Sequence, residues 1–406
     1  MRHMLHFQAD RIELALAFHK VPARVTGGTV TPRLVRFHLS TPLGVKVRQV
    51  EGLAEEIALS LGAPSCRVYR QEGQVQVEVP RVDARPVHLL DLCQRLHAPR
   101  PQAYPVPDTG KEAVLRRQRG AQAQVAGPGA QVSVPPFTAV LGLDQEGVPL
   151  LVRLPSPDVA HVLIAGTTGS GKTALARTII LSLAMYNSPR TLQLVLIDPK
   201  ARGLLPFEGL PHLLVPVVTR TEEALSILGR LVGEMERRDA ERRSEPRLVV
   251  VLDELADLVQ VGGREMEGVL TRLTQRGREA GIHLVACAQK PTAVVIGSLV
   301  KSNFPVRLVG SVASAEDAKV ASGLPGIGAE RLLGQGDFLL VAKGQVMRLQ
   351  AAYVEGEEIR EMVGRLRQGA RPLLLAATGT GGPAGAQTSS HTGLPLLGRL
   401  RLVKSR

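Results

Sequence analysis

The chain has 406 residues, of which 44% are hydrophobic and 21% charged, as is typical of a globular protein with two or three domains. It contains no run of about 18 apolar residues and no secretory signal, so we expect no intrinsic membrane span. Its three cysteines form no C-x-x-C pair, which is typical of reduced thiols and predicts a cytoplasmic protein. The formal net charge of +13 favours a polyanionic partner, nucleic acid before an anionic lipid surface.

Four segments of the chain differ in composition and periodicity. Residues 1–98 mix strand patterns with helical ones, including a helical stripe that ends at Gly62, and predict a small α+β domain. Residues 99–136 are rich in proline, glycine and alanine and predict a linker. Residues 137–367 predict the main domain. Residues 368–406 contain no acidic residue and predict a flexible basic tail.

Strand and helix patterns alternate through the main domain. Its strand patterns are apolar runs without polar alternation: HVLIAG, LQLVLID, RLVVVLDE and IHLVACAQ. Such runs are typical of strands that are buried on both faces of a parallel sheet. Helical stretches at 174–186, 222–238 and 264–280 lie between strand patterns. The alternation predicts an α/β fold with a mostly parallel sheet.

A phosphate-binding motif lies between the first of these strands and the helical stretch that follows. Residues 166–173 fit the pattern G-x-x-x-x-G-K-[ST]. The glycines allow backbone N–H groups to curl around a phosphate, and the start of the helix adds its positive dipole end. Lys172 would reach the β- and γ-phosphates, and Thr173 would bind Mg²⁺. The predicted nucleotide-binding residues are Gly166, Thr167, Thr168, Gly169, Ser170, Gly171, Lys172 and Thr173.

The strand pattern RLVVVLDELADL ends in a carboxylate pair. It delivers Asp253 to the carboxyl edge of the sheet, where α/β proteins bind ligands, and Asp253 would hold Mg²⁺. Glu254 is predicted to orient and polarise the attacking water. Gln289 ends the next strand pattern and would sense the γ-phosphate. Because the chain lacks an N-K-x-D guanine-binding motif, ATP is favoured over GTP.

These motifs occur together with LIDPK, REAGIHLVACAQKP and ERLLGQGDFL, and in this order they resemble the FtsK/SpoIIIE family of DNA translocases within the FtsK–HerA superfamily. PLGVKVRQVEGLAEEIALSLGA is similar to the family's α subdomain, so that the resemblance covers roughly residues 25–355. It implies a RecA-like P-loop ATPase core that forms a hexameric ring around duplex DNA and pumps the DNA by hydrolysing ATP. It further implies that Arg278 reaches the γ-phosphate bound by a neighbouring subunit, with Arg307 as the second choice.

Contacts to DNA are expected from two loops that face the centre of such a ring. Lys301 lies in the loop after Gln289, and Arg264 follows a pair of glycines. Aromatic residues make up only 3% of the chain, which disfavours stacking on the bases of a single strand. The composition instead favours contacts to the phosphate backbone of a duplex.

The chain departs from the usual pattern of this family, because the sequence shows neither membrane spans nor a winged-helix domain. Membrane anchoring and the reading of orienting DNA sequences would then need a partner, which the sequence does not identify. We expect a motor for chromosome segregation or mobile-element transfer. The alternatives are a HerA-like DNA end-processing motor that works with a nuclease, a type VII secretion-like protein-translocating ATPase, and a nucleotide-binding scaffold without catalysis. DNA-stimulated hydrolysis would separate the DNA motors from the other two.

Overall fold

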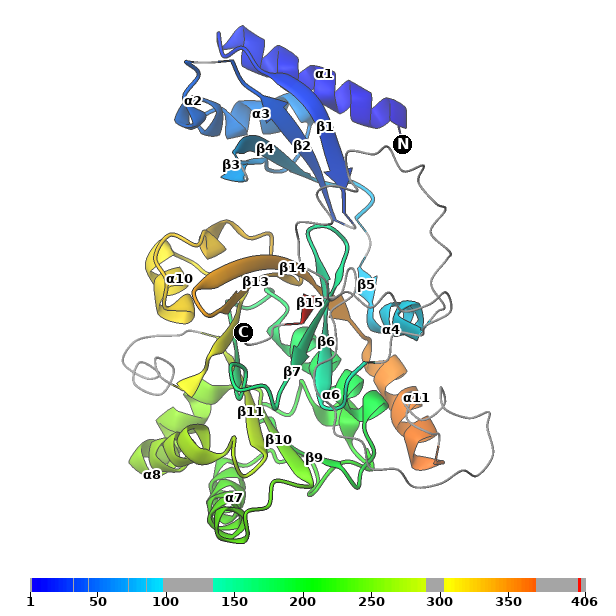
Figure 1. Ribbon diagram of the computed structural model, residues 1–406, viewed down its shortest axis with the longest axis vertical. Coiled ribbons are helices and arrows are strands. Elements are labelled where there is room, and N and C mark those ends of the chain that lie inside the picture. Colours follow the sequence, from blue (N-terminus) through cyan, green and yellow to red (C-terminus); the bar gives the residue numbers. More distant parts are fainter. Residues whose placement is uncertain are drawn as a thin grey trace, which may run out of the picture. The chain divides into compact units, whose positions relative to one another are not determined.

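The computed structural model of the chain describes residues 2–31, 33–42, 44–71, 73–84, 86–97, 134–289, 303–369 and 401–402. The chain divides into two compact units: Met1–Val87 with Gln145–Gly147, and His88–Asp144 with Val148–Arg406. Each unit has a sheet, helices and a hydrophobic core of its own (Figure 1).

The first unit is a four-stranded antiparallel sheet with helices packed on one face. Its described helices are α1 (Arg2–Phe18), α2 (Val47–Glu51) and α3 (Ala54–Leu61), and its strands are β1 (Arg24–Val30), β2 (Leu34–Ser40), β3 (Arg67–Gln71) and β4 (Gln74–Pro80). The strand order is β1-β2-β4-β3. Ile12, Phe37 and Ile57 join the helices to the sheet in one buried cluster. Helix α3 ends at Gly62, whose φ of 64° is left-handed. The predicted small α+β domain is confirmed.

The second unit contains the remaining elements. Its strands are β5 (Val87–His88, at the boundary), β6 (Thr138–Asp144), β7 (Pro149–Arg153), β8 (Val162–Ala165), β9 (Leu192–Ile197), β10 (Arg247–Leu252), β11 (Ile282–Ala288), β12 (Val306–Val309), β13 (Asp337–Ala342), β14 (Gln345–Tyr353) and β15 (Arg401–Leu402). Its described helices are α4 (Leu89–His97), α6 (Lys172–Tyr186), α7 (Thr221–Glu241), α8 (Leu255–Arg276), α10 (Ala315–Ser322) and α11 (Gly356–Arg367), with short 3-10 turns η1 (Leu205–Phe207) and η2 (Ala329–Arg331).

The sheet of the second unit has a parallel half and an antiparallel half. Strands β9, β10, β11, β8 and β12 lie side by side in this order and are parallel. Strands β13, β14, β6 and β7 extend the sheet from β12 with antiparallel pairings. The parallel half confirms the predicted α/β core. The antiparallel extension is an addition that the sequence patterns did not indicate.

The apolar runs of the sequence form the central parallel strands. Every residue of β8 and β11 is buried, because helices cover both faces of this part of the sheet. On one face, Leu228 of α7 and Leu270 of α8 belong to the same core cluster as Val250 of β10 and Leu284 of β11. Helices α7 and α8 lie side by side (Figure 1). Of the helices in the described ranges, none combines the length and the apolar character that a membrane crossing needs.

The boundary between the units differs from the expected division at residue 98. The second unit begins at His88, so α4 belongs to it. Leu89, Leu92 and Leu96 are buried in α4, which contacts β6 and β14. Their spacing places them on one helical face, which explains why this helix packs on the larger sheet. The expected linker lies outside the described residues up to residue 133, and so does the expected tail from 370 onward, apart from β15.

Candidate functional site

The phosphate-binding motif forms a tight loop between β8 and α6. The backbone is left-handed at Gly171, where φ is 101°. A Cβ atom at Gly171 would lie 2.8 Å from the amide nitrogen of Gly336, and one at Gly166 would lie 2.7 Å from the hydroxyl oxygen of Ser170. Only glycine fits these two positions, because a side chain at Gly171 would collide with the backbone of Gly336, and one at Gly166 would collide with Ser170 of the loop itself.

Backbone hydrogen bonds join the phosphate-binding loop to two other segments of the chain, at residue 311 and at residues 335–336. The amide of Thr167 donates to the carbonyl of Ser311 over 2.8 Å. The amides of Gln335 and Gly336 donate to the carbonyls of Gly169 and Ser170, each over 2.9 Å. The first of these bonds engages a loop amide and the other two engage loop carbonyls, whereas the first N–H groups of α6 have no partner within the helix. The N–H groups at the start of α6 are therefore suited to donate hydrogen bonds to a phosphate oxygen.

The strand order brings the predicted catalytic side chains to the same edge of the sheet. Strand β11 lies between β8 and β10, so the carboxyl ends of all three meet there. The hydroxyl of Thr173 donates to Oδ1 of Asp253 over 3.1 Å. The amide of Gln289 donates to Oε1 of Glu254 over 3.2 Å, and its side-chain amide donates to the hydroxyl of Thr168. Gln289 thus bridges the carboxylate to the phosphate loop.

Burial changes the charge balance of this edge. The pKa of Asp253 is raised to about 6, because the carboxyl group is buried and lies near the carboxylate of Asp198. The pKa of Lys172 is lowered by burial of its ammonium group. The ammonium of Lys172 now donates to the carbonyl of Thr167 over 3.0 Å. A bound divalent cation would add positive charge beside Asp253, and a bound phosphate would add negative charge beside Lys172.

The oxygen atoms at this edge fit a magnesium ion. Thr173 and Asp253 offer one oxygen each, and Mg²⁺ in phosphate sites takes one or two protein ligands together with water and phosphate oxygens. A buried oxygen of Asp198, Oδ1, has no hydrogen-bond partner in the described part of the chain. A Cβ atom at Gly203 would lie 2.5 Å from Oδ2 of Asp253, so the backbone closes tightly around the carboxylate. The described residues hold no cluster of three or more His, Cys, Asp or Glu that could bind a metal without a phosphate.

Two residues near the carboxylate pair were not predicted as site residues: Asp198, which lies near Asp253, and Lys200, which pairs with Glu254. Asp198 and Lys200 follow β9, and the LIDPK segment that contains them served only as part of the resemblance. Because β9 is parallel to β10, its carboxyl end lies at the same edge as Asp253. Polar residues directly after a buried strand run were the signal that could have identified them. The carboxylate of Asp198 accepts the amides of Gly203 and Leu204, and it therefore shapes the loop beside the metal position.

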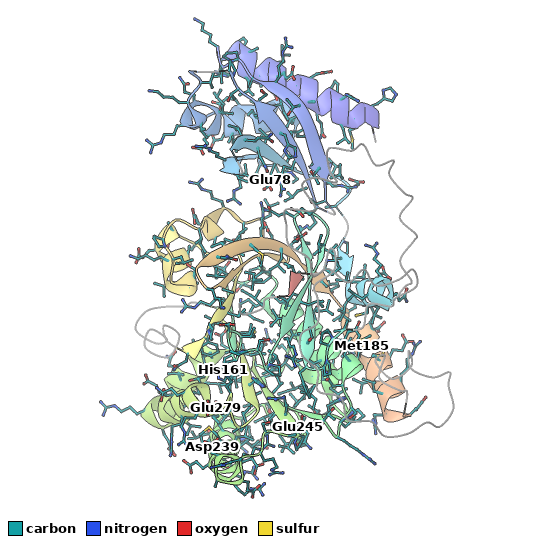
Figure 2. The ribbon with its side chains drawn as sticks, in the orientation of Figure 1. Glu78, His161, Met185, Asp239, Glu245 and Glu279 are labelled. Atoms are coloured by element: carbon teal, nitrogen blue, oxygen red, sulfur yellow. The ribbon has the colours of Figure 1, made fainter. Side chains whose placement is uncertain are left out.

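The candidates for the subunit contact lie away from this edge. Arg278 is exposed and precedes β11, at the end of the strand opposite to Gln289. Glu279, the next residue, is also exposed. Figure 2 labels Glu279 and, in the same unit, His161, which is buried and whose pKa is lowered to about 3 by burial. Arg307 is only 8% exposed, and its Nε donates to the carbonyl of Phe304 over 3.2 Å. Exposure therefore favours Arg278 for a contact with another subunit.

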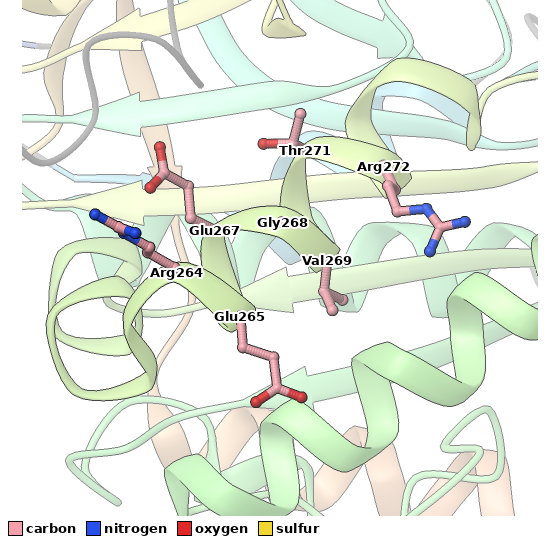
Figure 3. Close-up of a pocket in the computed structure, with 7 residues that line it drawn as sticks. All are labelled: Arg264, Glu265, Glu267, Gly268, Val269, Thr271 and Arg272. Carbon is pink, nitrogen blue, oxygen red and sulfur yellow. The ribbon is translucent and has the colours of Figure 1, made fainter.

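Of the two candidate DNA contacts, one can be placed. Lys301 lies outside the described residues. Arg264 is exposed and follows Gly263, where the backbone breaks the helical geometry of α8 with a φ of 58°. Arg264 lines an open surface groove of about 580 Å³ together with Glu265, Glu267, Gly268, Val269, Thr271 and Arg272 (Figure 3). The groove carries two arginines and two glutamates, so its charge is mixed.

The phosphate loop, the carboxylate pair after β10 and the strand inserted between them define the class of P-loop ATPases. The FtsK/SpoIIIE family profile matches residues 122–243 and 238–293, and the FtsK alpha domain profile matches residues 2–81. The DNA translocase FtsK of Mycobacterium tuberculosis is 32% identical over 415 residues, which cover 94% of this chain and 46% of that protein. The chain thus spans about half the length of the curated relative it matches. It belongs to the FtsK/SpoIIIE family.

Solved structures share the fold. The pCW3 conjugation coupling protein TcpA, in its monomer form with ATPγS, aligns with a TM-score of 0.54 and 18% identity over 89% of this chain and 99% of that chain. The cytoplasmic domain of the type VII secretion ATPase EccC from Thermomonospora curvata aligns with a TM-score of 0.53 and 26% identity over 70% of this chain and 34% of that chain. Because TcpA is only 18% identical to this chain, its similarity shows a shared fold alone.

Proposed function

We propose that the protein is an ATP-dependent double-stranded DNA translocase that works as a hexameric ring. The observation that carries the proposal is the single sheet edge at which Lys172, Thr173, Asp253, Glu254 and Gln289 meet. It occurs in a chain that is 32% identical, over 94% of its length, to a relative named DNA translocase. The net charge of +13 and the low aromatic content support a duplex as the substrate, bound through its phosphates.

The proposal assigns a role to each of the predicted site residues. The start of α6 and Lys172 bind the phosphates of ATP, and Thr173 and Asp253 bind Mg²⁺. When bound, Mg²⁺ neutralises charge on the phosphate oxygens. Glu254 accepts a proton from the attacking water, and Gln289 couples the state of the phosphate loop to the segment that follows β11. Arg264 and Lys301 contact the DNA backbone.

The position of Arg278 supports a shared active site. Strand β11 has seven residues and spans about 20 Å, so Arg278 at its start cannot reach the phosphate loop at the other edge of the same sheet. If Arg278 contributes to a nucleotide site, that site belongs to a second copy of the chain. A ring of copies arranged head to tail would place each Arg278 against the γ-phosphate of its neighbour.

Two inactive variants should restore hydrolysis when they are mixed. Arg278→Ala keeps Glu254 but lacks the arginine, and Glu254→Gln keeps the arginine but lacks the base. In rings that mix at random, about a quarter of the junctions then pair an intact Glu254 with an intact Arg278, because the contact is directional. The measurement is ATP hydrolysis in the presence of duplex DNA, for each variant alone and for the mixture.

The matched control is Arg276→Ala, which removes an exposed arginine of α8 that pairs with Asp239 at 2.8 Å. It should be active alone. Full activity of Arg278→Ala alone would refute its role, and a mixture that stays inactive would refute a site shared between subunits.

A further inference from the structure

Both carboxylate oxygens of Glu254 are engaged. Oε1 accepts the amide of Gln289, and Oε2 lies 3.4 Å from the ammonium of Lys200. The side chain of Glu254 is 7% exposed and that of Lys200 is 48% exposed. Lys200, which follows the end of β9, therefore pairs from a half-exposed position with a buried carboxylate.

These two contacts restrain Glu254, the proposed general base. A general base takes a proton only if one of its oxygens can come within hydrogen-bond reach of the attacking water. Lys200 pairs with Oε2 of Glu254, while Oε1 already accepts the amide of Gln289, so no oxygen of the carboxylate is free for the water in this arrangement. Hydrolysis then requires Glu254 to leave Lys200.

Lys200 has a second partner. Its ammonium lies 3.0 Å from Oδ2 of Asp257, closer than it lies to Glu254. Asp257 follows Glu254 by three residues, in the first turn of α8. When Glu254 turns toward a water, Lys200 keeps a carboxylate partner. The loss of the Lys200–Glu254 pair therefore does not leave the ammonium without a counter-charge.

We propose that Lys200 is a positioning residue that holds Glu254 back in the resting state and stays paired with Asp257 when Glu254 is released. The inference rests on the proposed function, since it takes Glu254 as the general base. It assigns Lys200 and Asp257 opposite effects: Lys200 slows hydrolysis, and Asp257 favours it by competing for the ammonium.

The test measures the kcat and KM of ATP hydrolysis without DNA for four variants. Lys200→Met should raise kcat about two- to fivefold, the range expected for an ion pair at a half-exposed site, and leave KM unchanged. Asp257→Asn should lower kcat by a similar factor, because Lys200 then has Glu254 as its carboxylate partner. The double variant should behave like Lys200→Met, because Asp257 acts through Lys200. Lys200→Arg should restore the slow rate.

The matched control is Arg237→Met in α7, which removes a basic side chain that is 57% exposed and also has two carboxylate partners, Glu234 and Glu241. It should leave kcat unchanged. A fall in kcat in Lys200→Met, or a change of the same sign in both single variants, would overturn the inference, as would no change in either. If Glu254→Gln retains hydrolysis, the base assignment of the proposed function fails instead. Thermal melting of each variant verifies that it is folded.

Discussion

Replacement of Glu254 by glutamine should abolish ATP hydrolysis while ATP binding is retained. Glutamine has nearly the same shape and keeps an oxygen that can accept the amide of Gln289, but it cannot take a proton from water. The loss of a general base typically lowers kcat by about 10²- to 10⁴-fold. Steady-state hydrolysis gives kcat, and titration with a slowly hydrolysed ATP analogue gives the affinity.

The control for this variant is Glu236→Gln in α7, which makes the same chemical change at an exposed glutamate that pairs with Arg272. It should hydrolyse ATP at the rate of the unaltered protein. A decrease of less than tenfold in kcat for Glu254→Gln would show that another group activates the water.

Replacement of Lys172 by alanine should weaken the binding of ATP. The ammonium gives up its bond to the carbonyl of Thr167 and forms charge-assisted hydrogen bonds to the phosphates, which contribute about 1.5–3 kcal/mol. The dissociation constant should therefore rise about 10- to 100-fold. Burial lowers the pKa of Lys172, so the bound phosphates would also restore its preference for the charged form.

The control for the change in net charge is Lys46→Ala, which removes an exposed lysine of the first unit. Nucleotide affinity should then be unaltered, as measured by calorimetry or by competition with a fluorescent analogue. An unchanged affinity in Lys172→Ala would place the nucleotide elsewhere in the protein.

The sequence predicted which residues lie at this edge of the sheet where the signal is local. The motif at 166–173 has a fixed spacing, and the apolar run before Asp253 shows that this residue ends a buried strand. Parallel strands end at the same edge, so the proximity of Thr173 and Asp253 followed from the strand patterns alone.

The rest depended on long-range pairing that periodicity does not reveal. Strand order places β11 between β8 and β10. This position brings Gln289 to both Thr168 and Glu254. The pair of Lys200 with Glu254 arises from the neighbourhood of β9 and β10. Helix α4 was assigned to the first domain by its place in the chain, whereas its apolar face packs on the larger sheet.

Displacement of a third strand from linear duplex DNA tests the central claim most directly. A labelled oligonucleotide bound as a triplex far from the DNA end is removed when a motor moves along the duplex. We expect displacement that requires ATP and Mg²⁺, is lost in Glu254→Gln, and leaves the two strands of the duplex paired. Hydrolysis of ATP on the same DNA without any displacement would contradict translocation along the double helix.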